Sequence, residues 1–221
     1  MFLQRLTRTS LLAARLVLVL AIAGCSGPGP MRDSAESAQR TDADMPVESE
    51  LAVPVIPAEA LTRYEQATAV MAAGDFVDAE LRFKEFVLLY PDYPGAFVNL
   101  AIIHASNEND PETQAALEAA LALDPDHPAA LNQMGMLLRR NGNFLEAEAA
   151  YLKAVTVSPD YALAHYNLGV LYELYLQRLE AALQHFEAYQ ALVGQDKQVE
   201  KWISDLTRRV AANQRTANVA E

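Results

Sequence analysis

From residue 60 onward, the pattern of hydrophobic and polar positions repeats every 34 residues. The period is marked by the equally spaced prolines Pro91, Pro125 and Pro159. Small residues at a second position follow the same spacing: Ala67, Ala101, Gly135 and Gly169. At this phase the units span residues 60–93, 94–127, 128–161 and 162 to about 196. Each unit predicts two antiparallel helices whose apolar faces are buried only when neighbouring units stack. The chain is therefore predicted to be all-α.

The third unit, PAALNQMGMLLRRNGNFLEAEAAYLKAVTVSPDY, shows the repeat most clearly. We number the residues of each unit as places one to thirty-four. The third unit has Gly135 at place eight, Ala147 at place twenty, Tyr151 at place twenty-four and Pro159 at place thirty-two. This combination resembles the tetratricopeptide repeat (TPR). The resemblance implies a helix-turn-helix solenoid of about four repeats over residues 57–211. Small residues at places eight and twenty let the paired helices approach closely, so a larger residue at Gly135 or Gly169 is expected to overpack their contact.

Two units depart from the pattern. The second lacks the turn glycine and has Asn109-Asp110-Pro111 instead, where Asp110 is expected to cap a helix and Pro111 to occupy its first turn. In the fourth unit Phe186 stands one place late, which indicates a one-residue insertion. No Gly or Pro stops the first helix of that unit near Leu176, so this helix is expected to be lengthened.

A further amphipathic helix is predicted from about residue 196. Its apolar positions follow helical spacing: Val199, Trp202, Ile203, Leu206 and Val210. The opposite face is charged, as in a helix that caps the open end of a repeat stack. The spacing favours burial of Trp202, and the alternative is that Trp202 belongs to a partner-binding surface. Residues 212–221 are expected to form a disordered tail.

The N-terminal segment has the layout of a secretory signal. Three arginines precede an unbroken apolar run, Leu16 to Ala23, and no acid appears before Asp33. The run is shorter than the roughly 18 residues of a membrane-spanning helix. Ile22-Ala23-Gly24-Cys25 resembles the bacterial lipobox, which implies cleavage of residues 1–24 and lipid on Cys25. The alternatives are an ordinary signal peptide with an incidental cysteine, or an uncleaved anchor.

Residues 25–56 are rich in Ser, Pro, Asp, Glu and Ala, and are predicted to form a disordered acidic tether. The whole chain has 17 basic and 29 acidic residues and a net charge of −12. Loss of the leader would remove three arginines and no acid, leaving −15. Nucleic acid is thereby disfavoured as a partner, because phosphate backbones bind basic surfaces.

No motif for catalysis, a cofactor or a metal is apparent. There is no Gly-rich phosphate loop, no paired-cysteine metal site and no serine in a nucleophile elbow. The histidines lack metal-ligand spacing: His104, His127, His165 and His185. We therefore expect no catalytic residue, no metal ligand and no cofactor.

The resemblance does imply a partner-binding groove. In TPR proteins partners lie against the first helix of each unit, at places two, five, six, nine, twelve and thirteen. The candidate groove residues carried over in this way are Asn99, Ile102, Gln133, Met136, Arg139, Arg140, Tyr166 and Asn167. Side-chain amides recur at place six, and an amide can both donate to and accept from a peptide backbone. The alternative is that Asn is simply common there. Leu163 and Asn167 stand where the carboxylate-clamp subtype has basic residues, so that subtype is not expected.

The sequence thus predicts an exported, lipid-anchored interaction scaffold, and Ser26 after the cysteine resembles outer-membrane sorting rather than inner-membrane retention. TPR lipoproteins of this kind belong to the Gram-negative envelope. The segment from Tyr166 through Arg209 looks like TPR proteins that accompany TonB, ExbB and ExbD machinery. A pilus pilotin or an envelope-assembly adaptor is the alternative, and an enzyme on a helical-repeat scaffold is the rival from another class. Oligomeric state stays open.

Overall fold

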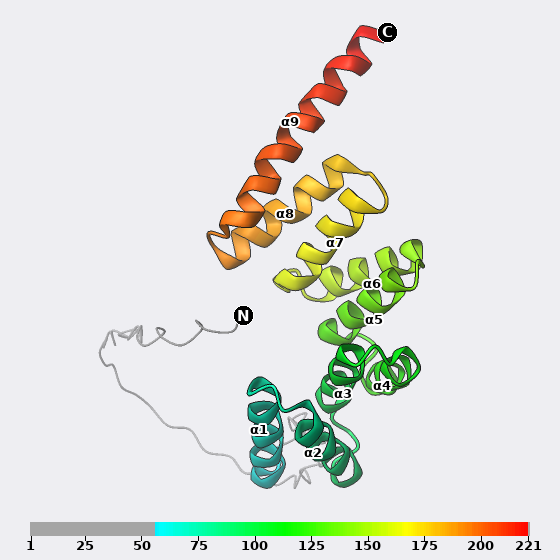
Figure 1. Ribbon diagram of the computed structural model, residues 1–221, viewed down its shortest axis with the longest axis vertical. Coiled ribbons are helices and arrows are strands. Elements are labelled where there is room, and N and C mark those ends of the chain that lie inside the picture. The colour runs from blue at the N-terminus through cyan, green and yellow to red at the C-terminus, as the bar shows by residue number, and fades with distance from the viewer. Residues whose placement is uncertain (1–55, 221) are drawn as a thin grey trace, which may run out of the picture. The chain divides into compact units, whose positions relative to one another are not determined.

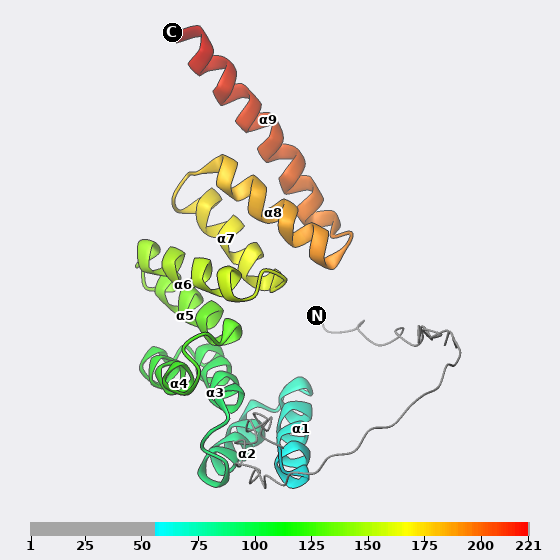
Figure 2. The ribbon, with the colours of Figure 1, turned by 180° about the vertical axis from the view of Figure 1, so that it is seen from behind.

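The computed structural model describes residues 56–220, in which all the regular elements are helices. Figures 1 and 2 show the helices following one another along the stack in chain order. Their bounds are α1 (Ala58–Ala72), α2 (Phe76–Leu89), α3 (Pro94–Ser106), α4 (Asp110–Leu123), α5 (Pro128–Arg140), α6 (Phe144–Val157), α7 (Ala162–Leu174), α8 (Leu179–Val193) and α9 (Lys197–Ala220). The predicted all-α architecture of paired helices with a final helix is confirmed.

The periodic prolines stand where helices end and begin. Pro91, Pro125 and Pro159 each follow the last residue of a second helix by two positions, where a proline prevents the helix from continuing. Pro94 and Pro128 occupy the first position of α3 and α5, where the missing N–H costs no hydrogen bond. The 34-residue period therefore fixes helix boundaries.

Each turn within a unit contains one residue in the left-handed region. The first and third units use glycine, Gly74 (φ 87°) and Gly142 (φ 81°). The second unit has Glu108 at the same place, with φ 57°. A non-glycine residue adopts this conformation at a cost of about 1–2 kcal/mol, so the turn geometry is kept without its preferred residue.

The cap expected of Asp110 is wrong. Asn109 occupies the N-cap position of α4, without a side-chain hydrogen bond to the helix, and Asp110 is the first helical residue. The carboxylate of Asp110 instead pairs with Arg140 of the next unit. The Asp110 carboxylate, which could have capped α4, therefore joins the second unit to the third.

The lengthened helix expected in the fourth unit is also wrong. α7 ends at Leu174 after 13 residues, the same length as α3 and α5. The extra residue lies in the turn before α8, where Gln177 takes the left-handed conformation with φ 53°. The one-residue insertion is therefore absorbed by the turn, which lets α7 and α8 pack like the other pairs.

Small residues at place eight face a large side chain on the second helix of the same unit. A Cβ atom placed on Gly135 would lie 2.5 Å from Cε1 of Tyr151, and one on Gly169 would lie 2.7 Å from the Phe186 ring. Both rings are buried. Ala67 packs in one core with Phe83, and Ala101 in the same core with Leu117. The two glycines thus stand opposite rings that leave no room for a Cβ atom.

α9 covers the end of the stack by packing on α8. Val199, Leu206 and Val210 are buried on its inner face, whereas Trp202 is only half-buried. The Asp196 carboxylate caps α9 by accepting from the backbone N–H groups of Gln198 and Val199, at 2.9 and 3.2 Å. The predicted amphipathic face is confirmed.

α9 is also longer than expected. It continues to Ala220, through residues for which the sequence predicts a disordered tail, and Figures 1 and 2 show it extending past α8. Residues 211–220 contain neither Gly nor Pro and include four alanines, so nothing in their composition ends a helix that has already been nucleated.

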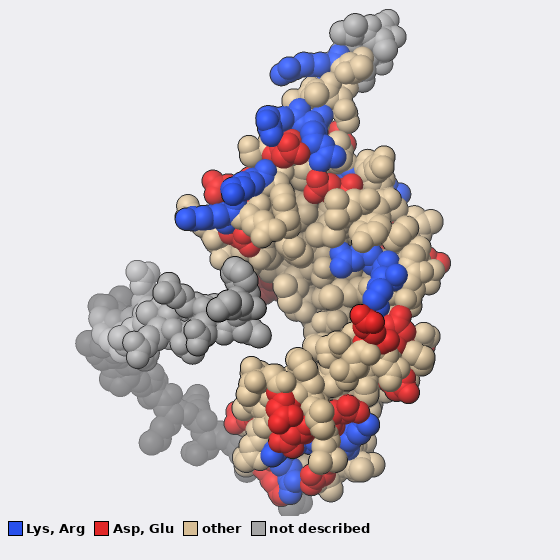
Figure 3. All heavy atoms as spheres, viewed as in Figure 1, with Lys and Arg blue, Asp and Glu red and all other residues tan. Residues whose placement is uncertain are grey.

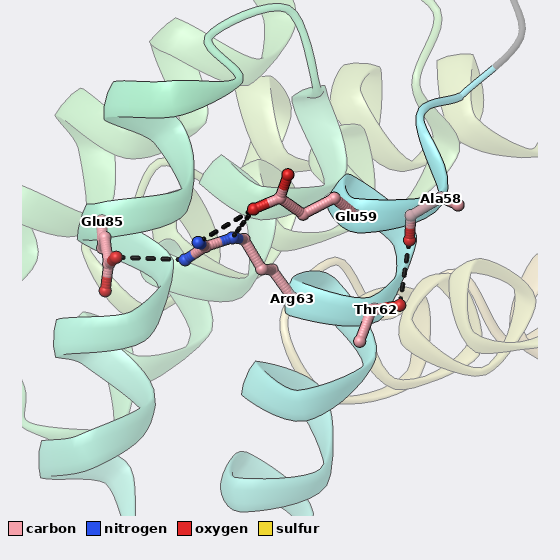
Figure 4. A network of polar contacts seen from close by, with 5 residues as sticks. All are labelled: Ala58, Glu59, Thr62, Arg63 and Glu85. Atoms are coloured by element: carbon pink, nitrogen blue, oxygen red, sulfur yellow. Dashed lines mark hydrogen bonds and ion pairs between the residues drawn. The ribbon is translucent and has the colours of Figure 1, made fainter.

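The first helix pair is joined at its surface by Arg63. Its guanidinium donates to Glu59 of α1 at 3.0 and 3.1 Å and to Glu85 of α2 at 3.1 Å (Figure 4). These side chains are exposed, so each pair contributes little to stability.

Candidate functional site

The first helices of the units, α1, α3, α5 and α7, form what we call the inner row. α5 packs against both α3 and α7, whereas no such packing joins the second helices of successive units in the described part of the chain. α3, α5 and α7 are therefore closer together than the second helices of their units, as in helices that line the concave side of a curved stack. The candidate groove residues all lie on α3, α5 and α7.

Polar side chains tie the inner row together at two of its three junctions. Asn99 donates to the Tyr64 hydroxyl at 2.8 Å, and Asn167 donates to Oδ1 of Asn132 at 2.9 Å. Each bond joins place five of one unit to place six of the next. Asn132 and Asn167 are buried, so their hydrogen bond satisfies amide groups that water does not reach. Asn99 and Asn167 are therefore already engaged within the stack.

The middle junction lacks this bond. Place five of the second unit is Val98, which has no polar atom for Gln133 to pair with. Gln133 is instead among the residues that line a cavity of about 460 Å³ at the C-terminal end of α5. With valine at place five, Gln133 lacks the partner that Asn99 and Asn167 have at the other two junctions.

Four of the eight candidate groove residues meet at this cavity: Gln133, Met136, Arg139 and Arg140. The remaining wall is formed by Ala105, Thr113, Leu137, Gly142, Phe144 and Tyr175. Tyr175 comes from the enlarged turn after α7, and its ring packs against Phe144 with centroids 4.7 Å apart. The sequence did not indicate Tyr175; its only signal was the insertion in the fourth unit.

The two arginines of the cavity differ in their surroundings. Arg140 pairs with Asp110 and also donates to the carbonyl of Ala105 at 3.3 Å. Nη1 of Arg139 is buried and has no hydrogen-bond partner among the described residues. Figure 3 shows basic and acidic side chains meeting on the face over the middle helices. Arg139 is therefore the arginine of this cavity that has no carboxylate partner among the described residues.

Ile102 and Tyr166 contribute mainly to packing. Ile102 is half-buried against the cluster of Val98, Ala120 and Ala130. The Tyr166 ring lies among Phe186, Tyr189 and Trp202, at centroid distances of 6.0, 5.3 and 6.0 Å. Tyr166 and Trp202 thus belong to one aromatic cluster beneath α9, which agrees with the structural interpretation of Trp202 over the partner-site alternative.

The structure brings together two histidines that are 20 residues apart in the sequence. Nδ1 of His165 lies 3.0 Å from Nδ1 of His185, and Nε2 of His165 lies 3.1 Å from the carbonyl of Pro159. A carbonyl only accepts, so neutral His165 carries its proton on Nε2 and accepts at Nδ1 from His185. Burial, together with the nearby His165, lowers the pKa of His185 to about 4. His185 is therefore neutral at pH 7, and its contact with His165 links α7 and α8.

His127 is the side-chain cap of α5, since its Nδ1 accepts from the backbone N–H of Ala130 at 3.3 Å. Within residues 56–220 no cluster of three or more His, Cys, Asp or Glu side chains could hold a metal ion. His127, His165 and His185 thus have structural partners in turns and between helices, and His104 is buried on α3.

Family comparison agrees with this geometry. The model of the tetratricopeptide repeat matches residues 64–128, 111–156 and 132–197, which together cover more than half of the chain. This chain belongs to the tetratricopeptide repeat family. No curated protein matches it.

Solved structures share the TPR fold at low sequence identity. PilF from Pseudomonas aeruginosa is 20% identical with a TM-score of 0.62, over 69% of each chain. TTC0263 from Thermus thermophilus is 19% identical with a TM-score of 0.59, over 68% of this chain and 82% of that one. The first TPR of Spaghetti (RPAP3), bound to an HSP90 peptide, is 18% identical with a TM-score of 0.50, over 53% of this chain and 95% of its own.

Cys25 and the predicted tether lie outside the residues that the structure describes. Within the described residues of this TPR protein, no helix is both long and apolar enough to cross a membrane.

Proposed function

We propose that this TPR protein is a non-catalytic scaffold that holds a segment of a partner protein against α5 of the inner row. TPR proteins are protein-interaction scaffolds, and the RPAP3 relative is a complex with a peptide. The observation that carries the proposal is the cavity, where Gln133, Met136 and Arg139 bring together an amide, a thioether and a cation. Of these groups, the Met136 thioether accepts from the Asn132 amide at 3.8 Å, whereas Nη1 of Arg139 has no partner among the described residues. Such a mixture of flexible apolar and polar groups suits a peptide segment.

An inner-face double variant, Gln133→Ala with Met136→Ala, tests this proposal. We expect it to capture at least about tenfold less of the main protein that copurifies with the wild type, because hot-spot contacts cost about 2 kcal/mol or more when truncated. Both side chains are at most partly buried, so thermal unfolding is expected to change little.

The matched control is Val77→Ala with Leu145→Ala, two exposed apolar residues on α2 and α6. This variant is expected to capture the partner as the wild type does. Equal capture by all three proteins, each unfolding at the same temperature, would contradict binding at the inner face.

We also propose that the scaffold is exported and held at the outer membrane by lipid on Cys25, facing the periplasm. The support comes from the arginine-rich leader, the short apolar run and the sequence Ile22-Ala23-Gly24-Cys25 followed by Ser26. Two or more acyl chains give stable anchoring without a spanning helix. The acidic tether would then let the repeat domain reach partners at a distance from the bilayer.

Cys25→Ser is expected to abolish lipid attachment and to remove the mature protein from the membrane fraction. The physical reason is that the apolar run is too short to anchor the chain by itself. Detergent partitioning and mass spectrometry of the N-terminal peptide measure the outcome. A mature Cys25→Ser protein that still fractionates with membranes would disprove lipid anchoring through this residue.

Within the envelope, we propose a role as an adaptor accessory to TonB, ExbB and ExbD machinery, on the resemblance of the segment from Tyr166 through Arg209. A pilus pilotin or an assembly adaptor is the second candidate, and the structural likeness to PilF makes it worth testing in parallel. The enzyme alternative is disfavoured by the composition of the cavity, since no carboxylate, histidine or cysteine is among the residues that line it.

A further inference from the structure

The cavity beside α5 holds a cationic group that the stack leaves without an acceptor. Nη1 of Arg139 is buried and has no hydrogen-bond partner in residues 56–220. A buried guanidinium N–H has lost its water, and without an acceptor it gains nothing in return. Arg140, the next residue in the chain, is already engaged by Asp110 and the Ala105 carbonyl. Arg139 lines the cavity and, unlike Arg140, has no carboxylate partner among the described residues, so an anionic ligand in the cavity would meet an unpaired guanidinium.

The rest of the wall does not oppose a negative charge. Met136, Leu137, Phe144 and Tyr175 supply apolar surface, and Gln133 supplies a neutral amide. No Asp or Glu is among the described residues that line the cavity. This is a departure from the chain as a whole, in which acids outnumber bases by 29 to 17. Because Arg140 is paired with Asp110, the cavity contains one uncompensated positive charge, that of Arg139.

We propose that the cavity binds an aspartate or glutamate side chain of the partner segment, with the Arg139 guanidinium donating to its carboxylate. Guanidinium and carboxylate form charge-assisted hydrogen bonds that are about twice as strong as neutral ones, and more so away from water. The Gln133 amide lies on the same wall and can pair with the backbone of the segment. This assignment rests on the proposed function, because it specifies the chemistry of the segment that α5 holds.

The acid is expected within the segment rather than at its chain end. The inner row continues on both sides of the cavity, in α3 and α7, which pack directly against α5. An extended segment that follows the row can therefore pass over the cavity and insert one side chain.

Peptide selection tests the assignment. A phage library of random dodecapeptides, fused through their C-termini so that no free carboxylate end is present, is panned on the full-length protein in detergent. The proteins compared are the wild type, Arg139→Gln and, as a control with the same loss of charge, Arg82→Gln, whose side chain pairs with Asp78 on α2. The wild type and the control are expected to enrich peptides with Asp or Glu at one fixed position, and Arg139→Gln to lose that preference.

A selected peptide gives the quantitative measure. Replacing its fixed acid by the corresponding amide is expected to weaken binding to the wild type about tenfold or more, and to change binding to Arg139→Gln much less. Selection of the same acidic peptides by Arg139→Gln would overturn the assignment. So would enrichment that requires a free C-terminus in a second library fused through the N-terminus.

The outcomes separate this inference from the proposed function. If the wild type enriches peptides without an acidic preference, and the Gln133→Ala, Met136→Ala variant loses them, the scaffold role stands and the Arg139 assignment fails. If none of the folded proteins enriches any peptide, both fail.

Discussion

Phe186→Ala is expected to lower the free energy of unfolding by about 3–5 kcal/mol, because it leaves a cavity that the surrounding residues cannot fill. Phe186 is 1% exposed. Its ring packs against the backbone of α7 at Gly169 and lies 5.5 Å from the Trp202 ring of α9. One side chain therefore joins α7, α8 and α9, and Gly169 has no side chain that could move into the space. Denaturant unfolding followed by circular dichroism measures the loss.

Trp202→Ala provides the comparison. Because Trp202 is half-buried, its removal is expected to cost about 2 kcal/mol, less than the 3–5 kcal/mol of a fully buried ring. If Phe186→Ala costs less than about 1 kcal/mol, or less than Trp202→Ala, then the final helix is not held to the stack through Phe186.

Gly135→Val is expected to destabilise the third unit strongly. Its Cβ would lie 2.5 Å from Cε1 of Tyr151, which is a buried ring rather than the flexible end of a surface side chain. Either the ring or the two helices must shift, and overpacking of this kind costs about 1–3 kcal/mol or more, before the two extra methyl groups are added. We therefore expect a loss of about 3 kcal/mol in denaturant unfolding.

A double-mutant cycle shows whether the clash is the cause. Tyr151→Leu makes room opposite residue 135, so Gly135→Val is expected to cost at least about 1 kcal/mol less in the Tyr151→Leu background than alone. Additive losses would mean that the Gly135 backbone, rather than contact with Tyr151, limits the position.

The period of the repeat made most of the fold predictable. Pro91, Pro125 and Pro159 constrain the backbone locally, and small residues such as Gly135 and Gly169 are required wherever two helices touch. Such requirements act at fixed sequence positions, so they are visible in a single chain. The final helix was equally visible, because the apolar positions from Val199 to Val210 follow helical spacing.

The errors arose where several conformations satisfy the same local sequence. The turn after α7 has no Gly, yet Gln177 adopts the left-handed conformation, because packing of α7 against α8 determines where the helix must end. Asp110 was expected to cap its own helix and instead pairs with Arg140, a partner 30 residues away. Choices of this kind depend on neighbours that the sequence alone does not place.

The candidate site was predictable at the level of helices but not of side chains. The sequence placed eight residues on the first helices of the units, and four of them line the cavity: Gln133, Met136, Arg139 and Arg140. It could not show that Asn99 and Asn167 are engaged by Tyr64 and Asn132, since these bonds join residues 35 positions apart. Nor could it show that Tyr175 completes the wall. The absence of a polar residue at Val98 is the one sequence signal that sets Gln133 apart.

The central claim is that a partner protein lies on the inner face at α5, and site-specific photocrosslinking in living cells tests it most directly. A photoreactive phenylalanine analogue is placed at Met136, which lines the cavity and is 37% exposed, or at Leu152 of α6, which is 38% exposed. With exposure matched in this way, the account predicts a covalent adduct with one partner protein from position 136 and none from position 152. An adduct with the partner from position 152 and none from position 136 would contradict it.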